Sequence, residues 1–556
     1  MLVIAFNWIY ILFTIFCMGF AFSVFAEKVL CYRFRRLDSV LIAGLVMVTV
    51  YAQIFSLFYR VNVEANLCLI LMCAASVAAF RKRMISAIKK TYEECSLAKK
   101  ILIPVLFIVW CYFTSRGYLV PDTSLYHAQS IRWIEEYGVV KGLGNLNGRF
   151  AYNSSVFAVT ALYSMVFLWG ESLHAVNGLI AFILSFETLN LGKCFQRKKM
   201  ILSDYARVAV LYYFSLVWDE VVAPSSDYAV MFVIFFIVIK WLVLLEDTET
   251  RKNIAPYSLL CVLGVYALTL KLSASLILIL LIKPAYGMLK EKRWKEILIY
   301  LTMGILTAAP WMTRTVIISG WLFYPFSALD LFNVDWKMTN IGEINTDAAL
   351  IKIWAKGANN IGINATFRQW FPNWFLNHLT FMEKMIVVGD AVSSIVVVIA
   401  GLRLLLKKQW EKTGSLFVLF AMMCCYLFWQ FSAPMPRYGH AYILLLVSLT
   451  AGFLLQDRQI IAKPVYLILF VYGIYKVYTV CSYASAYLGY LPMYVWQQDY
   501  EEYDGLIAVE VNGVTIYTSP EGWITGYDHF PTGGTLEVLE RIELRGDDLS
   551  DGFRLK

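Results

Sequence analysis

The residues best suited to chemistry lie in one short polar segment that follows an apolar run. It reads Pro121-Asp122-Thr123-Ser124-Leu125-Tyr126-His127 and continues to Glu135. Proline followed by Asp-Thr-Ser is typical of a helix start, where the Asp122 carboxylate could accept hydrogen bonds from free backbone N–H groups. At the mouth of an apolar cavity, the same carboxylate could instead take a proton from an acceptor hydroxyl. The spacing leaves both roles open.

Aromatic residues and histidines accompany this segment. All five histidines fall at or beyond one end of the apolar runs, the end predicted below to face outward. A single histidine near an interface is ordinarily solvated, whereas polar clustering at one face indicates a water-accessible site. We predict that the substrate cavity is lined by six side chains: Tyr126, His127, Trp133, Tyr324, Tyr438 and His440.

A second acidic segment follows a later apolar run. It runs from Asp219-Glu220 to Asp227, and we predict Asp227, or less favourably Asp219, as a second acid or metal ligand. Two carboxylates could share a divalent cation such as Mg²⁺ or Mn²⁺, which prefers oxygen ligands. Because the two acids come from separate loops, the metal requirement stays open.

Three cations lie at the same predicted level: Lys271, Arg314 and Arg437. Such cations suit an anionic lipid phosphate, and arginine offers two parallel hydrogen bonds. For Lys271 and Arg314 the alternative is a side chain that extends to the membrane interface. Arg437 fits that alternative less well, because Pro436 and Tyr438 restrain its backbone.

The rest of the chain shows what must position these residues. Of 556 residues, 60% are hydrophobic and 16% are charged, which excludes a soluble enzyme or a nucleic-acid-binding protein. Apolar runs near the length that spans a hydrocarbon core recur throughout. By residue number they are 2–26, 38–59, 63–80, 100–116, 153–169, 173–193, 204–218, 228–246, 256–271, 272–290, 296–313, 381–405, 413–432, 440–455 and 463–482.

The positions of Lys and Arg in short loops predict the orientation, because such residues mark the cytoplasmic side. If every run crossed, Arg197-Lys198-Lys199 would lie outside. We therefore predict that 153–169, which begins with polar Asn153-Ser154-Ser155, lies in the outer interface instead. The result is an all-α polytopic protein of about 14 spans, with both termini outside.

Three regions follow from this topology. Residues 1–99 hold additional N-terminal spans and a basic linker, 100–482 form the main membrane module with outer loops at 115–172 and 314–380, and 483–556 form an outer tail. The tail holds 13 acidic and 4 basic residues. Asn512-Gly513 between alternating apolar residues predicts a β-hairpin there.

An early outer loop with Asp122, a following interfacial helix, a second acidic loop and a long later outer loop together resemble the GT-C class of integral-membrane glycosyltransferases. The segments Pro121 to Gly138, Ser319 to Pro325 and Ala433 to Gly439 resemble a bacterial group of polytopic proteins in that class. The resemblance covers roughly residues 100–445. The chain lacks the WWDYG motif of oligosaccharyltransferases and an acid-x-acid pair at Asp122.

The resemblance implies a glycosyltransferase of the bacterial inner membrane, with its site on the extracytoplasmic side. It would move a sugar from a polyprenyl-phosphate-linked donor to a glycan, lipid or protein acceptor, without nucleic acid. Asp122 would be the catalytic acid/base, Asp227 the second acid, and Lys271 with Arg437 the phosphate ligands. The alternatives are an O-antigen-type polymerase or ligase, a lipid-linked-sugar flippase or transporter, and an inert membrane scaffold.

Overall fold

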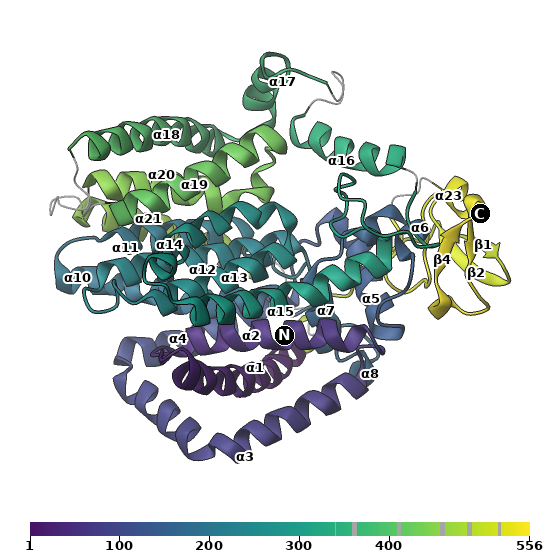
Figure 1. The fold of residues 1–556 in the computed structure, drawn as a ribbon, viewed down its shortest axis with the longest axis horizontal. Helices are drawn as coiled ribbons and strands as arrows, with labels where there is room; N and C mark the ends of the chain where they lie inside the picture. Colours follow the sequence, from purple (N-terminus) through teal and green to yellow (C-terminus); the bar gives the residue numbers. More distant parts are fainter. Residues whose placement is uncertain (340, 358–363, 408–412, 456–461, 486–491, 521–523) are drawn as a thin grey trace.

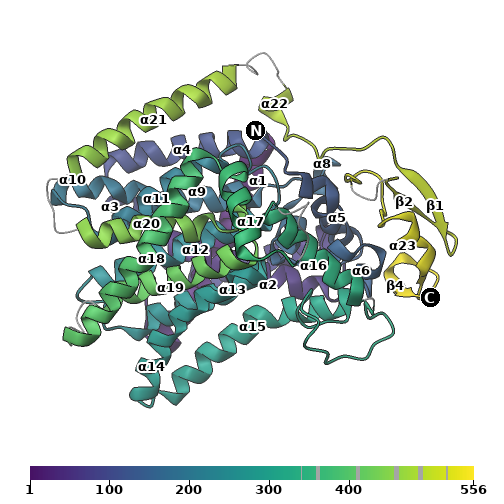
Figure 2. The same ribbon diagram turned by 90° about the horizontal axis from the view of Figure 1, so that it is seen from above.

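The computed structural model describes residues 1–556 except 340, 358–363, 408–412, 456–461, 486–491 and 521–523. Most helices run side by side in one bundle, and a small module containing the strands lies at one end of it (Figure 1). The view from above shows α10 at the opposite end (Figure 2).

Within the described residues, nine helices are long and apolar enough to cross a membrane. They are α1 (Leu2–Val29), α2 (Leu37–Ser56), α3 (Val63–Glu94), α4 (Leu97–Ser115), α12 (Ser226–Glu246), η4 (Leu272–Leu281) continued by α14 (Ile282–Lys290), α15 (Trp294–Ser319), α18 (Phe381–Lys407) and α19 (Thr413–Ser432). The predicted polytopic helical membrane protein is thereby confirmed. The total of fourteen spans stays a prediction.

The other helices complete the bundle and its connections. The apolar ones are α7 (Ser155–Tyr163), α8 (Val166–Trp169), α9 (Val176–Thr188), α11 (Leu202–Val217), α13 (Ile254–Leu270), α20 (His440–Leu455) and α21 (Ala462–Ser485). The connecting ones are η1 (Thr123–His127), α5 (Ala128–Glu136), α6 (Leu143–Leu146), η2 (Gly148–Ala151), η3 (Leu189–Gly192), α10 (Lys193–Arg197), α16 (Ile341–Ala355), α17 (Phe367–Asn373), η5 (Trp374–His378), η7 (Pro436–Tyr438), α22 (Pro492–Val495), α23 (Leu536–Arg541) and η9 (Leu549–Asp551).

Helix α12 forms the centre of the bundle. It is apolar on every side, and its residues from Asp227 to Leu242 are all buried. A helix that is hydrophobic all round is expected in the core, and α9, α11, α13, α19 and α20 pack around this one. By contrast, only 22% of the most apolar stretch is buried in each of α15 and α18, as expected for helices at a lipid boundary.

The segment 153–169 does not form the single interfacial helix that we predicted. It forms two short helices that break at Met165, whose φ is 54°, and α7 is buried inside the bundle. The side chains of Asn7 and Asn66 donate hydrogen bonds to the carbonyls of Tyr163 and Leu162. Polar partners inside the protein therefore allow this short helix to be buried rather than lie at the surface.

The segment nevertheless does not cross the bundle. Arg36, which follows α1, and Arg207, at the start of α11, both pair with Glu187, at 2.9 Å and 3.2 Å. Asp204 joins Arg207 to Arg197, so Arg36 and Arg197 lie at the same end. An even number of crossings, made by α2, α3, α4 and α9, must separate them.

The C-terminal module, defined as residues 499–520 and 524–556, contains two antiparallel pairs. Strand β1 (Ile507–Val511) pairs with β2 (Val514–Thr518), and β3 (Ile542–Leu544) pairs with β4 (Phe553–Leu555). The Asn512-Gly513 hairpin is confirmed, and both turn residues have positive φ, at 50° and 82°. The module has no separate core: its Phe553 packs in one cluster with Trp133 of α5 and with Trp321.

Candidate functional site

Asp122 lies in the first turn of a helical segment that begins at Pro121 and continues into η1, a single π-helical turn. Its side chain makes no capping hydrogen bond to that turn. Instead, its Oδ2 atom lies 2.5 Å from Nη2 of Arg437. The capping role is therefore not the one adopted. Single π turns are frequent at functional sites, where they turn a side chain out of the regular helical register.

Arg437 joins both predicted acids. It stands in η7, the short turn between α19 and α20, and its Nε lies 3.0 Å from Oδ2 of Asp227. Asp227 occupies the first turn of α12, and only 5% of its side chain is exposed. One guanidinium thus pairs with two carboxylates that are 105 residues apart, by the difference of their numbers.

Lys271 completes the group, which we call the four-charge cluster: Asp122, Asp227, Lys271 and Arg437. Lys271 ends α13 and forms an ion pair with Asp227. Its Nζ also lies 3.9 Å from the ring centre of Tyr438, close enough for a cation–π interaction. The four formal charges sum to zero, and four separate segments of the chain supply them.

The environment keeps Asp122 ionised. Burial raises the pKa of its carboxyl, but the charge of Arg437, with smaller contributions from His127 and Lys271, outweighs burial and holds the pKa below its ordinary value. A carboxylate that is ionised at neutral pH can accept a proton. However, it is a weak base while its charge is shared with Arg437.

Two predicted cavity residues lie next to Asp122. The rings of Tyr126 and His127 are 4.3 Å apart, and His127 also contacts Phe157 at 5.2 Å. Burial lowers the pKa of His127 to about 4, against the charges of Asp122 and Asp227. His127 is therefore neutral at pH 7.

An aromatic row continues from there. Tyr126 faces Tyr152 at 6.4 Å, and Tyr152 contacts Tyr324 at 5.1 Å. The structure thus connects the predicted residues Tyr126, His127 and Tyr324 through Tyr152, which the sequence did not single out. Tyr438 lies beneath Lys271, as described above.

Three predicted residues, Arg314, Trp133 and Asp219, lie elsewhere, and His440 lies near the cluster, within reach of the charges of Asp227 and Arg437. Arg314 is buried on α15, where it donates to Ser56 and, at 3.2 Å, to Asn153. The remaining three have other contacts: Trp133 packs on Phe530 at 4.8 Å, the Asp219 carbonyl accepts from Tyr118 N–H at 2.6 Å, and the His440 ring faces Tyr213 at 5.4 Å.

The donor set does not favour a divalent metal. Among the described residues, no group of three or more His, Cys, Asp and Glu side chains is placed to bind a metal ion. The two carboxylates of the cluster converge on Arg437. A metal shared by them would have to displace this guanidinium.

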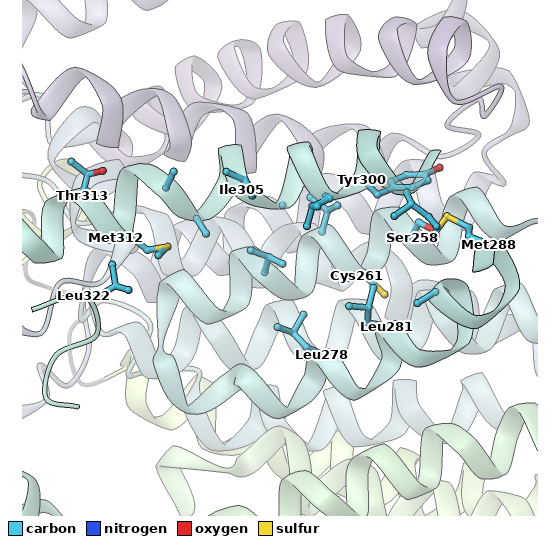
Figure 3. A pocket seen from close by; sticks show the side chains of 18 of the residues that line it. Ser258, Cys261, Leu278, Leu281, Met288, Tyr300, Ile305, Met312, Thr313 and Leu322 are labelled. Atoms are coloured by element: carbon cyan, nitrogen blue, oxygen red, sulfur yellow. The ribbon is translucent and has the colours of Figure 1, made fainter. Parts of the chain in front are cut away.

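An apolar groove of about 790 Å³ lies on the lipid-facing side of the bundle (Figure 3). Helices α13 and α15 form its walls together with η4 and α14, and its lining runs along α15 from Ile297 to Ile317. That stretch rises roughly 30 Å, about the thickness of a hydrocarbon core. Lys271 stands at the turn between α13 and η4, and thus at one end of the wall that these two elements form.

The sequence did not single out Glu135 as a functional residue, although it ends the polar segment that begins at Pro121; in the structure it lies on α5. Its carboxylate is fully buried and accepts hydrogen bonds from Tyr527 Oη at 2.5 Å and from Ser172 Oγ at 2.7 Å. Tyr527 belongs to the C-terminal module, which no short-range pattern connects to residue 135.

We expect Glu135 to make stability depend on pH. Burial raises its pKa from 4.5 to about 7, although the hydrogen bonds from Tyr527 and Ser172 oppose the shift. Because the folded protein holds this proton more tightly than the unfolded chain does, the carboxyl contributes to the free energy of unfolding. That contribution is fully present below about pH 4.5 and is lost as the pH rises to about 7. The loss is roughly 3 kcal/mol. Thermal unfolding in detergent should show this decrease, and Glu135→Gln should flatten it; an identical decrease in the variant would contradict the assignment.

The fold and the site thus define a polytopic helical membrane protein with a neutral cluster of four charges at one end of its helix bundle and a C-terminal module at the same end. The chain belongs to the family described as a domain of unknown function, DUF8201, whose model matches residues 1–444. The match includes all four members of the cluster and ends before the C-terminal module. Neither the comparison with curated proteins nor the comparison with solved structures gives a match.

Proposed function

We propose that this protein is a membrane glycosyltransferase that uses a polyprenyl-phosphate-linked sugar and works on the extracytoplasmic face of a bacterial inner membrane. The observation that carries the proposal is the four-charge cluster, because it places a carboxylate beside two cations at the end of the bundle. The cations suit a lipid phosphate, and the apolar groove, one wall of which is α13, the helix that ends at Lys271, suits a polyprenyl chain.

The ion pairs suggest how donor binding would activate Asp122. A phosphate that binds Arg437 and Lys271 competes with the two carboxylates for the same N–H donors. Once Arg437 is shared with phosphate, it lowers the pKa of Asp122 less, and the carboxylate becomes a stronger base. Asp122 would then accept the proton of an acceptor hydroxyl, whose oxygen attacks the sugar carbon while the lipid phosphate leaves.

A flippase remains the second candidate, because the groove could hold a lipid carrier without any transfer. It differs from the transferase in what happens to the bond between sugar and phosphate. A flippase moves the intact lipid-linked sugar between leaflets, whereas a transferase separates sugar from lipid.

Arg437→Lys should weaken donor binding more than chemistry. Lysine keeps the charge but loses the planar guanidinium that reaches both Asp122 and Asp227. Losing one charge-assisted hydrogen bond, worth about 1.5–3 kcal/mol, should raise the KM for the donor by roughly 10- to 100-fold. The measurement is initial-rate kinetics beside Arg403→Lys, an exposed control on α18. Equal KM values in the two variants would argue against a phosphate at Arg437.

The proposed orientation predicts that α10 faces the cytoplasm. A cysteine at Lys198 or Lys199 should resist impermeant thiol reagents in whole cells, and Asp504→Cys in the outer module should react. Both need a background in which the exposed Cys31, Cys68 and Cys481 are serine. Labelling at residue 198 together with protection at residue 504 would show that the protein has the opposite orientation in the membrane.

A further inference from the structure

The C-terminal module contacts the segment that carries Asp122. The N–H groups of Thr525 and Gly526 both donate to the carbonyl of Ser124, each at 3.0 Å. Ser124 is the second residue after Asp122 and belongs to the same π turn. The module therefore holds the backbone of η1 directly, close to the carboxylate that pairs with Arg437.

Two side chains of α5 strengthen this contact. Gln129 Nε2 lies within 3.2 Å of the carbonyls of Gly526 and Tyr527, and 2.8 Å from that of His529. Arg132 Nη1 donates to the carbonyls of Tyr527 and Asp528, at 2.6 Å and 2.7 Å. One turn of the module thus lies on the face of α5 that carries residues 129, 132 and 135.

The contact is also packed and largely sealed from water. The Arg132 guanidinium stacks over the ring of Phe530 at 4.8 Å, and Tyr527 stacks on Tyr500 at 5.1 Å. Gln129 is fully buried. A buried amide that loses its carbonyl partners costs more than a surface contact does, so this contact has a single favoured geometry.

We propose that Gln129 and Arg132 are positioning residues through which the C-terminal module holds η1 so that Asp122 meets Arg437. The module lies beyond residues 1–444, the part of the chain that the family model matches, and so acts on the site from outside the matched region. The positioning concerns the geometry of the cluster itself; only its kinetic consequence rests on the proposed function.

The test compares Gln129→Glu and Arg132→Gln with Arg132→Lys as the conservative rescue and Arg554→Gln as a control on the module. Gln129→Glu replaces the amide donor by a carboxylate oxygen, which cannot donate to the three carbonyls that Gln129 Nε2 contacts. Arg132→Gln removes the guanidinium. The first readout is the rate at which phenylglyoxal modifies Arg437, mapped by mass spectrometry. If Asp122 no longer meets Arg437, the guanidinium loses a charge-assisted hydrogen bond. The rate of Arg437 modification should then rise roughly tenfold or more in both disruptive variants. The rescue and control variants should resemble wild type.

Hydrogen exchange of the amides at 123–127 is the second readout, and it should accelerate in the same two variants. The third is sugar transfer, in which kcat should fall while the KM for the donor stays constant, because Lys271 and Arg437 remain. Unchanged Arg437 reactivity would overturn the positioning role whether or not the protein transfers sugar. Altered reactivity with an unchanged kcat would support the positioning role and overturn its kinetic consequence. Altered reactivity in a protein without any transfer would support positioning and reject only the proposed function.

Discussion

Replacing Asp122 by asparagine is expected to lower sugar transfer by roughly 10²–10⁴-fold, the usual contribution of a general base. Asparagine keeps the shape of the side chain, and its amide oxygen can still accept from Arg437. It has no carboxylate to take a proton from an acceptor hydroxyl. The protein should therefore remain folded and bind the donor while kcat collapses.

The measurement is transfer at matched membrane abundance, with Asp219→Asn as the matched control. Asp219 lies outside the four-charge cluster, and burial raises the pKa of its carboxyl. We expect Asp219→Asn to retain transfer close to wild type. If Asp122→Asn is as active as wild type, Asp122 is a structural partner of Arg437 and not the base.

The second large effect is expected at the other end of the bundle, where Glu187→Gln should destabilise the fold by roughly 3–5 kcal/mol. Glu187 is fully buried and pairs with Lys240 at 2.6 Å, Arg36 at 2.9 Å and Arg207 at 3.2 Å. Asp38 and Asp204 are the remaining acids of this network. Removing its central charge leaves the buried Lys240 and Arg207, together with Arg36 and Arg197, to share the two remaining carboxylates.

Thermal unfolding in detergent measures this effect, and Glu93→Gln is the control. Glu93 lies on α3, pairs with Lys89 at 3.9 Å and is 63% exposed, so its loss should cost at most about 1 kcal/mol. The unfolding midpoint should fall clearly for Glu187→Gln and hardly for Glu93→Gln. Equal midpoints would mean that the network adds no stability.

Much of the architecture could be predicted because apolar run length and loop charge obey strong constraints in a bilayer. The hairpin at Asn512-Gly513 was predictable for a local reason, since its turn needs two residues that tolerate positive φ. The segment 153–169 was only partly predictable. Its failure to cross followed from the charge of Arg197, but its burial depends on Asn7 and Asn66, which come from distant helices.

The candidate site, too, could be predicted only in part from the sequence. Asp122, Asp227, Lys271 and Arg437 could be chosen by residue type and by their predicted level. Their convergence could not be derived, because four separate segments contribute one charge each. Arg314 has the same residue type and predicted level as Arg437, yet it points from α15 to Asn153. Which face of a helix meets which neighbour is decided by packing that one sequence does not reveal.

The most direct measurement is transfer by the wild-type protein in proteoliposomes supplied with polyprenyl-phosphate lipids that carry radiolabelled sugars, together with membrane-derived acceptors. We expect the label to leave the organic-soluble lipid and enter the acceptor fraction, with the lipid phosphate released. Asp122→Asn should leave the label in the lipid. Label that stays lipid-linked with wild type, for every donor that binds, would contradict a transferase. If that label moves between leaflets while the sugar remains attached, the protein is a flippase.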